Sequence, residues 1–137
     1  MNSYTCRNTA LNSLQKWDIG NRVRTILLAD ADIAAMVGQN IYPIVAPENT
    51  DGDFIVYRRE SYSKSGVKMG VTEDNCIVAV TAISDSYDDS VAMASAIDNA
   101  LYGEHNDNGA KFICTLEDSS ETYDDDKYIQ TLLIKIK

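Results

Sequence analysis

The only histidine of the chain, His105, is the first residue to consider for acid–base chemistry, because the carboxylates of Glu104 and Asp107 stand close to it in the sequence. A general base must be positioned by a partner inside a cleft, whereas the segment around His105 has the composition of an exposed polar loop. The sequence contains no Gly-rich phosphate-binding loop, nucleophile elbow or paired-histidine zinc motif. We therefore predict no catalytic residue, no cofactor and no enzymatic activity.

Carboxylates also gather in the segment Asp118–Lys127, where they could attract a cation. A calcium loop would need alternating acidic residues, a glycine and a closing glutamate at fixed spacing, and this segment lacks that spacing. We predict a solvated acidic turn and no metal site. Its acidic residues are Asp118, Glu121, Asp124, Asp125 and Asp126.

The three cysteines, Cys6, Cys76 and Cys114, match neither a metal-binding spacing nor a disulfide framework. Cys76 and Cys114 lie in apolar, strand-like runs. We expect both to be small buried residues in a reducing compartment.

The charge balance argues against nucleic-acid recognition. Acidic residues outnumber basic ones 21 to 12, which gives a formal net charge of −9. A chain of this charge is repelled by phosphate backbones, although it can stand beside DNA without binding it. No apolar run approaches the roughly 20 residues that a membrane helix needs, and we expect no secretory signal and no membrane partner.

Basic residues are concentrated in one stretch, where they suggest an interface. They are either solvated strand ends or a basic arm that faces the acidic turn of a neighbouring copy. A head-to-tail ring needs two different complementary patches on each subunit, and opposite charges would set their register. The candidate interface residues are Arg58, Arg59, Tyr62, Lys64, Lys68 and Met69.

The elements that must position these residues begin with two helices. A first helix is expected to start near Asp18, with one apolar stripe at helical spacing. A second should be capped by Asp30 and end at Gly38. The two apolar faces are formed by Ile19, Val23, Ile26 and Leu27 and by Ile33, Met36 and Val37.

Strand patterns follow. Ile41–Pro43 is expected to be extended, Phe54–Glu60 to be a strand, and Cys76–Ile83 to be a central strand covered on both faces. Between the last two, Ser61–Asn75 is expected to form a long exposed hairpin arm or loop. We expect this arm to become ordered on assembly.

A third helix is expected after Ser86, which forms a capping box with Asp89 and leads to a helix that ends at Gly103. Its core stripe should be Val91, Ala94, Ile97 and Leu101. The pattern then predicts a turn at His105–Gly109 and strands at Lys111–Glu117 and Tyr128–Lys137.

This order of elements predicts an α+β fold: a mostly antiparallel sheet of about four to five strands with helices packed on one face. We expect residues 1–16 to be a flexible N-terminal segment and residues 17–137 to form a single domain.

The segment Leu27–Pro47 resembles the opening of the bacteriophage tail completion, or tail terminator, family. It has a helix, a short helix that starts at an aspartate and ends in Val37-Gly38, an Ile-Tyr-Pro element and a second proline. Phe54–Tyr57 resembles the strand that follows in that family, with Asp53 where proline is common. The later elements keep the family order, so the resemblance covers Ile19–Lys137. The Ser61–Asn75 arm, the Asp118–Lys127 turn and the N-terminal residues have no counterpart in it.

The resemblance implies a structural protein of the virion that forms a ring, expected to be a hexamer, at the head-proximal end of the tail tube. There it would terminate tail growth and join the tail to the head. Its partners would be itself, the tail tube protein and head-completion or connector proteins, after assembly in the bacterial cytoplasm. DNA would pass through without specific binding. From the net negative charge of the chain, and not from the resemblance, we expect an acidic lumen lined by the acidic turn, unless that turn faces outward or meets Arg58 and Arg59 of a neighbour.

Two other functions stay open. One is a neck or head-closure connector of related fold. The other, from a different class, is a small ligand-binding or enzymatic α+β domain, which would show one deep apolar pocket with convergent polar groups. A ring former should instead show its apolar patches on opposite flanks of a shallow surface.

Overall fold

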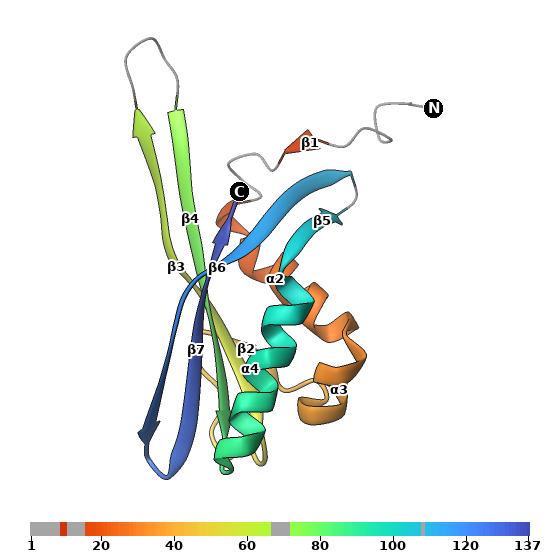
Figure 1. Ribbon diagram of the computed structural model, residues 1–137, viewed down its shortest axis with the longest axis vertical. Coiled ribbons are helices and arrows are strands. Elements are labelled where there is room, and N and C mark those ends of the chain that lie inside the picture. Colours follow the sequence, from red (N-terminus) through yellow and green to blue (C-terminus); the bar gives the residue numbers. More distant parts are fainter. Residues whose placement is uncertain (1–8, 11–15, 67–71, 108) are drawn as a thin grey trace.

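The computed structural model describes residues 9–10, 16–66, 72–107 and 109–137. Helices α2, α3 and α4 lie on one side of a curved sheet, and the paired ends of β3 and β4 project beyond the helices (Figure 1). The described elements are, in chain order, β1 (Thr9–Ala10), α2 (Ile19–Ala29), α3 (Ala31–Val37), β2 (Ile41–Pro43), β3 (Phe54–Gly66), β4 (Thr72–Ser84), α4 (Tyr87–Leu101), β5 (Gly103–Asp107), β6 (Ala110–Asp124) and β7 (Lys127–Ile136).

The sheet has seven strands in the order β1-β6-β7-β4-β3-β2, with β5 also paired to β6. Each of the long strands β3, β4, β7 and β6 is antiparallel to the next in this order, whereas β2 pairs with β3 and β1 with β6 in parallel. The α+β class is confirmed. The expected count of four to five strands is too low, because β1, β2 and β5 are short and held by backbone pairing that leaves little apolar periodicity in the sequence.

Most of the predicted flexible segment 1–16 lies outside the described residues. Thr9 and Ala10 pair with Ala110 and Lys111 of β6. The predicted flexibility of that segment therefore stays a prediction.

Helices α2 and α3 follow the predicted pattern closely. Asp30 caps α3, since its Oδ1 accepts a hydrogen bond from the Ile33 N–H at 3.0 Å, and Gly38 ends the helix at a φ of 62°. One residue of the predicted apolar face is wrong: Met36 is 37% exposed. Only Ile33 and Val37, four residues apart, turn toward the core, because a helix of this length presents one narrow stripe.

Helix α4 begins as predicted, but its start is satisfied differently. The Asp89 N–H donates to Ser86 Oγ at 3.3 Å. The Ser86 N–H donates to Ser84 Oγ at 3.1 Å, whereas a full capping box would have used the carboxylate of Asp89.

The core stripe of α4 is rotated relative to the prediction. Val91 is 41% exposed, and Met93 faces the core in its place. Ser90 is also buried, and its Oγ donates to the Tyr87 carbonyl at 2.7 Å and accepts from Gln130 at 3.3 Å. Helical periodicity of apolar residues favours Val91 over a serine at the core. The hydrogen bonds of Ser90 offset the cost of burying its hydroxyl group.

The hairpin between β3 and β4 extends through most of the segment Ser61–Asn75. The pairing runs from Phe54 opposite Ile83 to Gly66 opposite Thr72, with a bulge between Arg59 and Ser61. The hairpin form of the predicted arm is therefore confirmed. Residues 67–71, which include the candidate interface residues Lys68 and Met69, lie outside the described residues.

Two predicted turns are strands. Residues 103–107 form β5, which pairs with the start of β6. Strand β6 continues to Asp124, and the chain reverses only at Asp125 and Asp126, whose φ angles are 52° and 61°. Two consecutive residues at positive φ are typical of a tight two-residue hairpin turn. The predicted ten-residue acidic turn is thus mostly strand, because its residues up to Asp124 pair with β7.

Strand β4 lies at the centre of the sheet, as predicted. Cys76, Val78, Val80 and Ala82 are buried on the face that the helices cover. The predicted cover on the other face is wrong, since Ile77, Thr81 and Ile83 on that face are only partly buried. The described helices α2, α3 and α4 all pack against one side of the sheet (Figure 1).

Val80→Asp is expected to unfold the domain. Val80 is 0% exposed, and an unpaired carboxylate there costs several kcal/mol against a total stability of about 5–15 kcal/mol for a typical domain. Circular dichroism during urea titration measures the loss. Val91→Asp is the matched control, because its site is exposed and the variant should unfold cooperatively near the wild-type midpoint. A folded Val80→Asp protein would contradict the described core.

Candidate assembly interface

His105 lies on β5 and is half-buried, which corrects the prediction of an exposed loop. Its Nε2 is 2.6 Å from the carbonyl oxygen of Leu101, and its ring stacks on Phe112 with centroids 5.4 Å apart. These contacts join the end of α4 to β5 and β6. His105 therefore has a role in packing within the fold.

The two described cysteines, Cys76 and Cys114, are free and buried, as predicted. Burial raises the pKa of the Cys114 thiol to about 12, so the reactive thiolate is scarce near neutral pH. No cluster of metal-ligating side chains occurs among the described residues. Within those residues, no helix has the length and apolar character needed to cross a membrane.

The two adjacent arginines of β3 lie on opposite faces of the sheet. Arg59 pairs with Val78 on the helix-covered face, and Arg58 pairs with Ala79 on the uncovered face. Arg58 forms an ion pair with Glu60, with Nη1 2.6 Å from Oε2. The two arginines are adjacent in the sequence and were predicted to belong to one interface. They cannot contact one partner from the same side of the sheet.

Arg59 belongs to an aromatic–cationic cluster formed by Trp17, Arg59, Tyr62 and Lys64. The Arg59 Nη1 donates to the Trp17 carbonyl at 3.0 Å, and its guanidinium carbon lies 4.3 Å from the centre of the Trp17 ring. Tyr62 meets Trp17 edge-on at 5.6 Å, and the Lys64 Nζ lies 5.9 Å from the Tyr62 ring.

Trp17 is 57% exposed despite these contacts. Tryptophan, tyrosine and arginine are the residues most enriched among energetic hot spots of interfaces. The charge and periodicity patterns of the sequence did not single out Trp17. Its status as the only tryptophan of the chain was the available signal.

The five acidic candidates do not share one turn. Asp118, Glu121 and Asp124 are on β6, opposite Leu133, Gln130 and Lys127 of β7. At about 3.3 Å per residue, Asp118 and Asp124 are roughly 20 Å apart. The acidic surface is therefore a long strand edge that ends in the Asp125-Asp126 turn.

Glu121 is held by the start of α4. Its Oε2 accepts hydrogen bonds from the Tyr87 hydroxyl at 2.9 Å and from the Gln130 amide at 3.0 Å. The bond from Gln130 and then the bond from Tyr87 lower the pKa of Glu121, and the same carboxylate raises the pKa of Tyr87. Glu121 therefore keeps its negative charge near neutral pH, and both hydrogen bonds that it accepts come from residues of its own chain.

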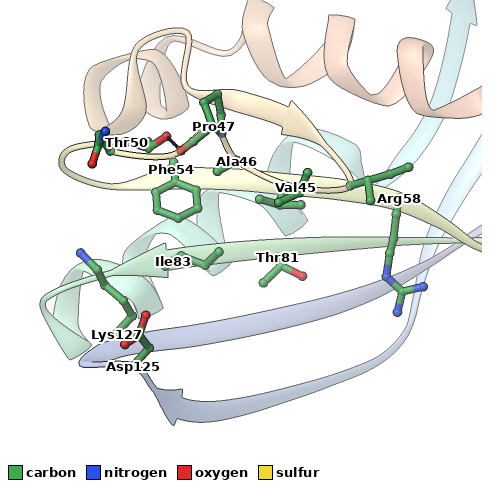
Figure 2. Close-up of a pocket in the computed structure, with 13 residues that line it drawn as sticks. Val45, Ala46, Pro47, Thr50, Phe54, Arg58, Thr81, Ile83, Asp125 and Lys127 are labelled. Carbon is green, nitrogen blue, oxygen red and sulfur yellow. Dashed lines mark hydrogen bonds between the residues drawn. The ribbon is translucent and has the colours of Figure 1, made fainter.

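An open groove of about 550 Å³ lies on the uncovered face of the sheet. Figure 2 shows Phe54, Thr81 and Ile83 along it, with Arg58 at one end and Asp125 and Lys127 at the other. Lys127 forms an ion pair there with Asp85, with Nζ 2.6 Å from Oδ1.

The loop that borders this groove is apolar and strained. Ile44 and Val45 are each 73% exposed. Ile44 has a φ of 65°, an unfavourable conformation for a β-branched residue, and its N–H donates to the Tyr57 carbonyl at 2.8 Å. The groove is an open surface lined by exposed apolar residues, which suits a macromolecular contact better than an enclosed ligand.

The described residues therefore form an α+β module whose surface has charged strand edges, an exposed aromatic–cationic cluster and an apolar groove. The family model "Tail completion protein gp17" matches residues 21–133. The chain belongs to this family of bacteriophage tail completion proteins, which are structural components of virions.

A solved structure described as "Virion of native gene transfer agent (GTA) particle" contains a chain of similar fold. The two chains superpose with a TM-score of 0.68 at 20% sequence identity, over 83% of this chain and 89% of that one. At this identity the likeness concerns the fold. No curated protein matches the sequence.

Arg59→Ala should change the fluorescence of Trp17. Removal of the guanidinium exposes more of the indole ring, so the emission maximum should move to longer wavelength. The loss of an exposed cation–π contact should cost about 0.5–1 kcal/mol. Arg58→Ala is the matched control, because Arg58 lies on the opposite face and should leave the spectrum unchanged. Equal spectra for both variants would contradict the described contact.

Proposed function

We propose that the protein forms a ring at the head-proximal end of the phage tail tube, where it terminates tail growth and joins the tail to the head. The family match over residues 21–133 is the observation that carries this proposal. The surface supports it physically, because a closed ring needs two different, complementary patches on each subunit. The chain has a basic arm on β3 and an acidic edge on β6.

The partners in this proposal are further copies of the chain, the tail tube protein and a head-completion or connector protein. The aromatic–cationic cluster and the groove lie on opposite faces of the sheet. Each face of the sheet therefore has an apolar or aromatic surface that is available for contact with a partner protein. A hexamer is the expected number of subunits.

The net charge fits a ring that DNA crosses without binding. Six copies would carry 6 × −9 = −54 formal charges. A basic lumen would hold DNA through phosphate contacts, whereas an acidic one repels it within a Debye length of about 8–10 Å. The other acidic residues are spread along β6. We therefore propose that only Asp125 and Asp126, at the tip of the hairpin, line the lumen.

Ring formation is tested by light scattering and electron microscopy of the purified protein, alone and with tail tubes assembled from tube protein. We expect ring-shaped caps at one end of each tube and no further tube growth after their addition. A protein that stays monomeric and leaves tube growth unchanged would refute the proposal. A ring that binds only head connectors would favour the neck or head-closure function.

Replacing both Asp125 and Asp126 with Lys should leave particles intact and slow DNA ejection. The two lysines would add phosphate contacts where the lumen is proposed to be acidic. Ejection kinetics after receptor addition measure the effect. The control replaces Glu48 and Asp51, two exposed residues of another loop, with Lys and should eject at the wild-type rate. Equal rates for both variants would place the hairpin tip away from the lumen.

A further inference from the structure

Two strand edges of this fold are left without a neighbouring strand over much of their length. Strand β2 pairs with β3 only at Ile55–Tyr57, and β5 pairs with β6 only at Ala110–Cys114. Beyond those points, β3 from Arg58 and β6 from Thr115 have, among the described strands, partners on one side only. The two edges belong to the outer long strands of the sheet and so lie on opposite sides of it.

Exposed strand edges present unpaired N–H and C=O groups and can pair with another chain. Each edge here carries charge and a bulge, which are features that discourage indiscriminate pairing. The bulges lie between Arg59 and Ser61 on β3 and between Leu116 and Asp118 on β6. The charges of the two edges, however, have opposite sign.

The β3 edge, residues 58–66, contains three basic residues and one acidic residue, a formal charge of +3 − 1 = +2. The β6 edge, residues 115–124, contains four acidic residues and no basic one, a formal charge of −4. Pairing of two β6 edges would place like charges opposite each other, whereas a β3 edge attracts a β6 edge. Charge thus favours a head-to-tail contact over a two-fold symmetric one.

The strand directions agree with this choice. The strands β3, β4, β7 and β6 alternate in direction, so β3 and β6 run oppositely within one chain. A second copy in the same orientation would therefore bring its β6 antiparallel to β3 of the first copy. The sheet would continue across the contact with all helices on one surface.

The lengths of the edges also agree. Each edge runs about 30 Å at roughly 3.3 Å per residue. When the edges are aligned antiparallel over this length, with Glu60 left in its bulge, Arg58 stands opposite Asp124 and Ser63 opposite Ser120. Within the chain these four residues pair with positions on the uncovered face of β4 and β7, so both pairs would share one face.

We propose that neighbouring copies of this chain join by antiparallel pairing of the β3 edge of one copy with the β6 edge of the next. This inference rests on the proposed ring and names the contact that closes it. Pairing would add backbone hydrogen bonds between the two strands and bring their opposite charges together. The ion pair of Arg58 with Glu60 is exposed, with the Arg58 side chain 51% accessible, and exposed pairs of this kind are easily exchanged.

Disulfide trapping tests the register. Ser63→Cys and Ser120→Cys are combined in a Cys6→Ser background, in which the remaining cysteines, Cys76 and Cys114, are buried. Oxidation of assembled rings should give a ladder of covalent oligomers up to the full ring. Either cysteine alone should give none beyond a dimer. The control pairs Ser63→Cys with Ser95→Cys, an exposed position on α4, and should not form a ladder.

Charge reversal tests the energetics. Arg58→Glu should raise the protein concentration needed for half-assembly about tenfold or more, since it places carboxylates opposite each other. Adding Asp124→Arg should restore assembly. The control Lys135→Glu makes the same change of charge on the inner strand β7 and should assemble as the wild type does. Circular dichroism checks that each variant is folded.

The outcomes separate this contact from the proposed function. Wild-type rings on tail tubes, with no ladder from the Ser63–Ser120 cysteine pair and no effect of Arg58→Glu, would overturn edge pairing and leave the ring function intact. A wild-type protein that never assembles would overturn both. A ladder together with rescue by Asp124→Arg supports the edge contact.

Discussion

The structure depends on the burial of one face of β4. Cys76, Val78, Val80 and Ala82 alternate along this central strand and meet the helices with almost no exposed surface. Because side chains alternate with a period of two, a slip of one residue would turn this whole row away from the core. The pairing of β4 with β3 and β7 is therefore fixed by hydrophobic burial, and every other strand takes its register from these three.

Placing all the described helices on one face of the sheet has a consequence for function. The helices leave the opposite face and the outer strand edges uncovered. This part of the surface includes the exposed apolar residues Ile44 and Val45 and the charged strand edges. Such surfaces are costly for a protein that acts alone, because they invite association. They are useful for a virion component, whose role is to associate in one geometry, and this accords with membership of the tail completion family.

Local patterns predicted the parts of the fold in which one short stretch of sequence decides the outcome. The cap at Asp30, the start of α4 at Ser86 and the central position of β4 were predicted correctly. The prediction failed where a distant partner decides. Met93 rather than Val91 faces the core, and the buried Ser90 beside them hydrogen-bonds to Gln130 of the distant strand β7. Residues 103–107 form a strand because they pair with β6.

The sequence by itself determined the α+β class, the central strand, the acidic charge and the resemblance to tail completion proteins, since these follow from composition, periodicity and the order of motifs. Tertiary structure alone decided that Arg58 and Arg59 face opposite sides, that Trp17 stacks under Arg59, and that the acidic residues form a strand edge rather than a turn. The physical reason is that strand pairing and side-chain contact join residues distant in the chain. Their partners, and not their own types, determine where they lie.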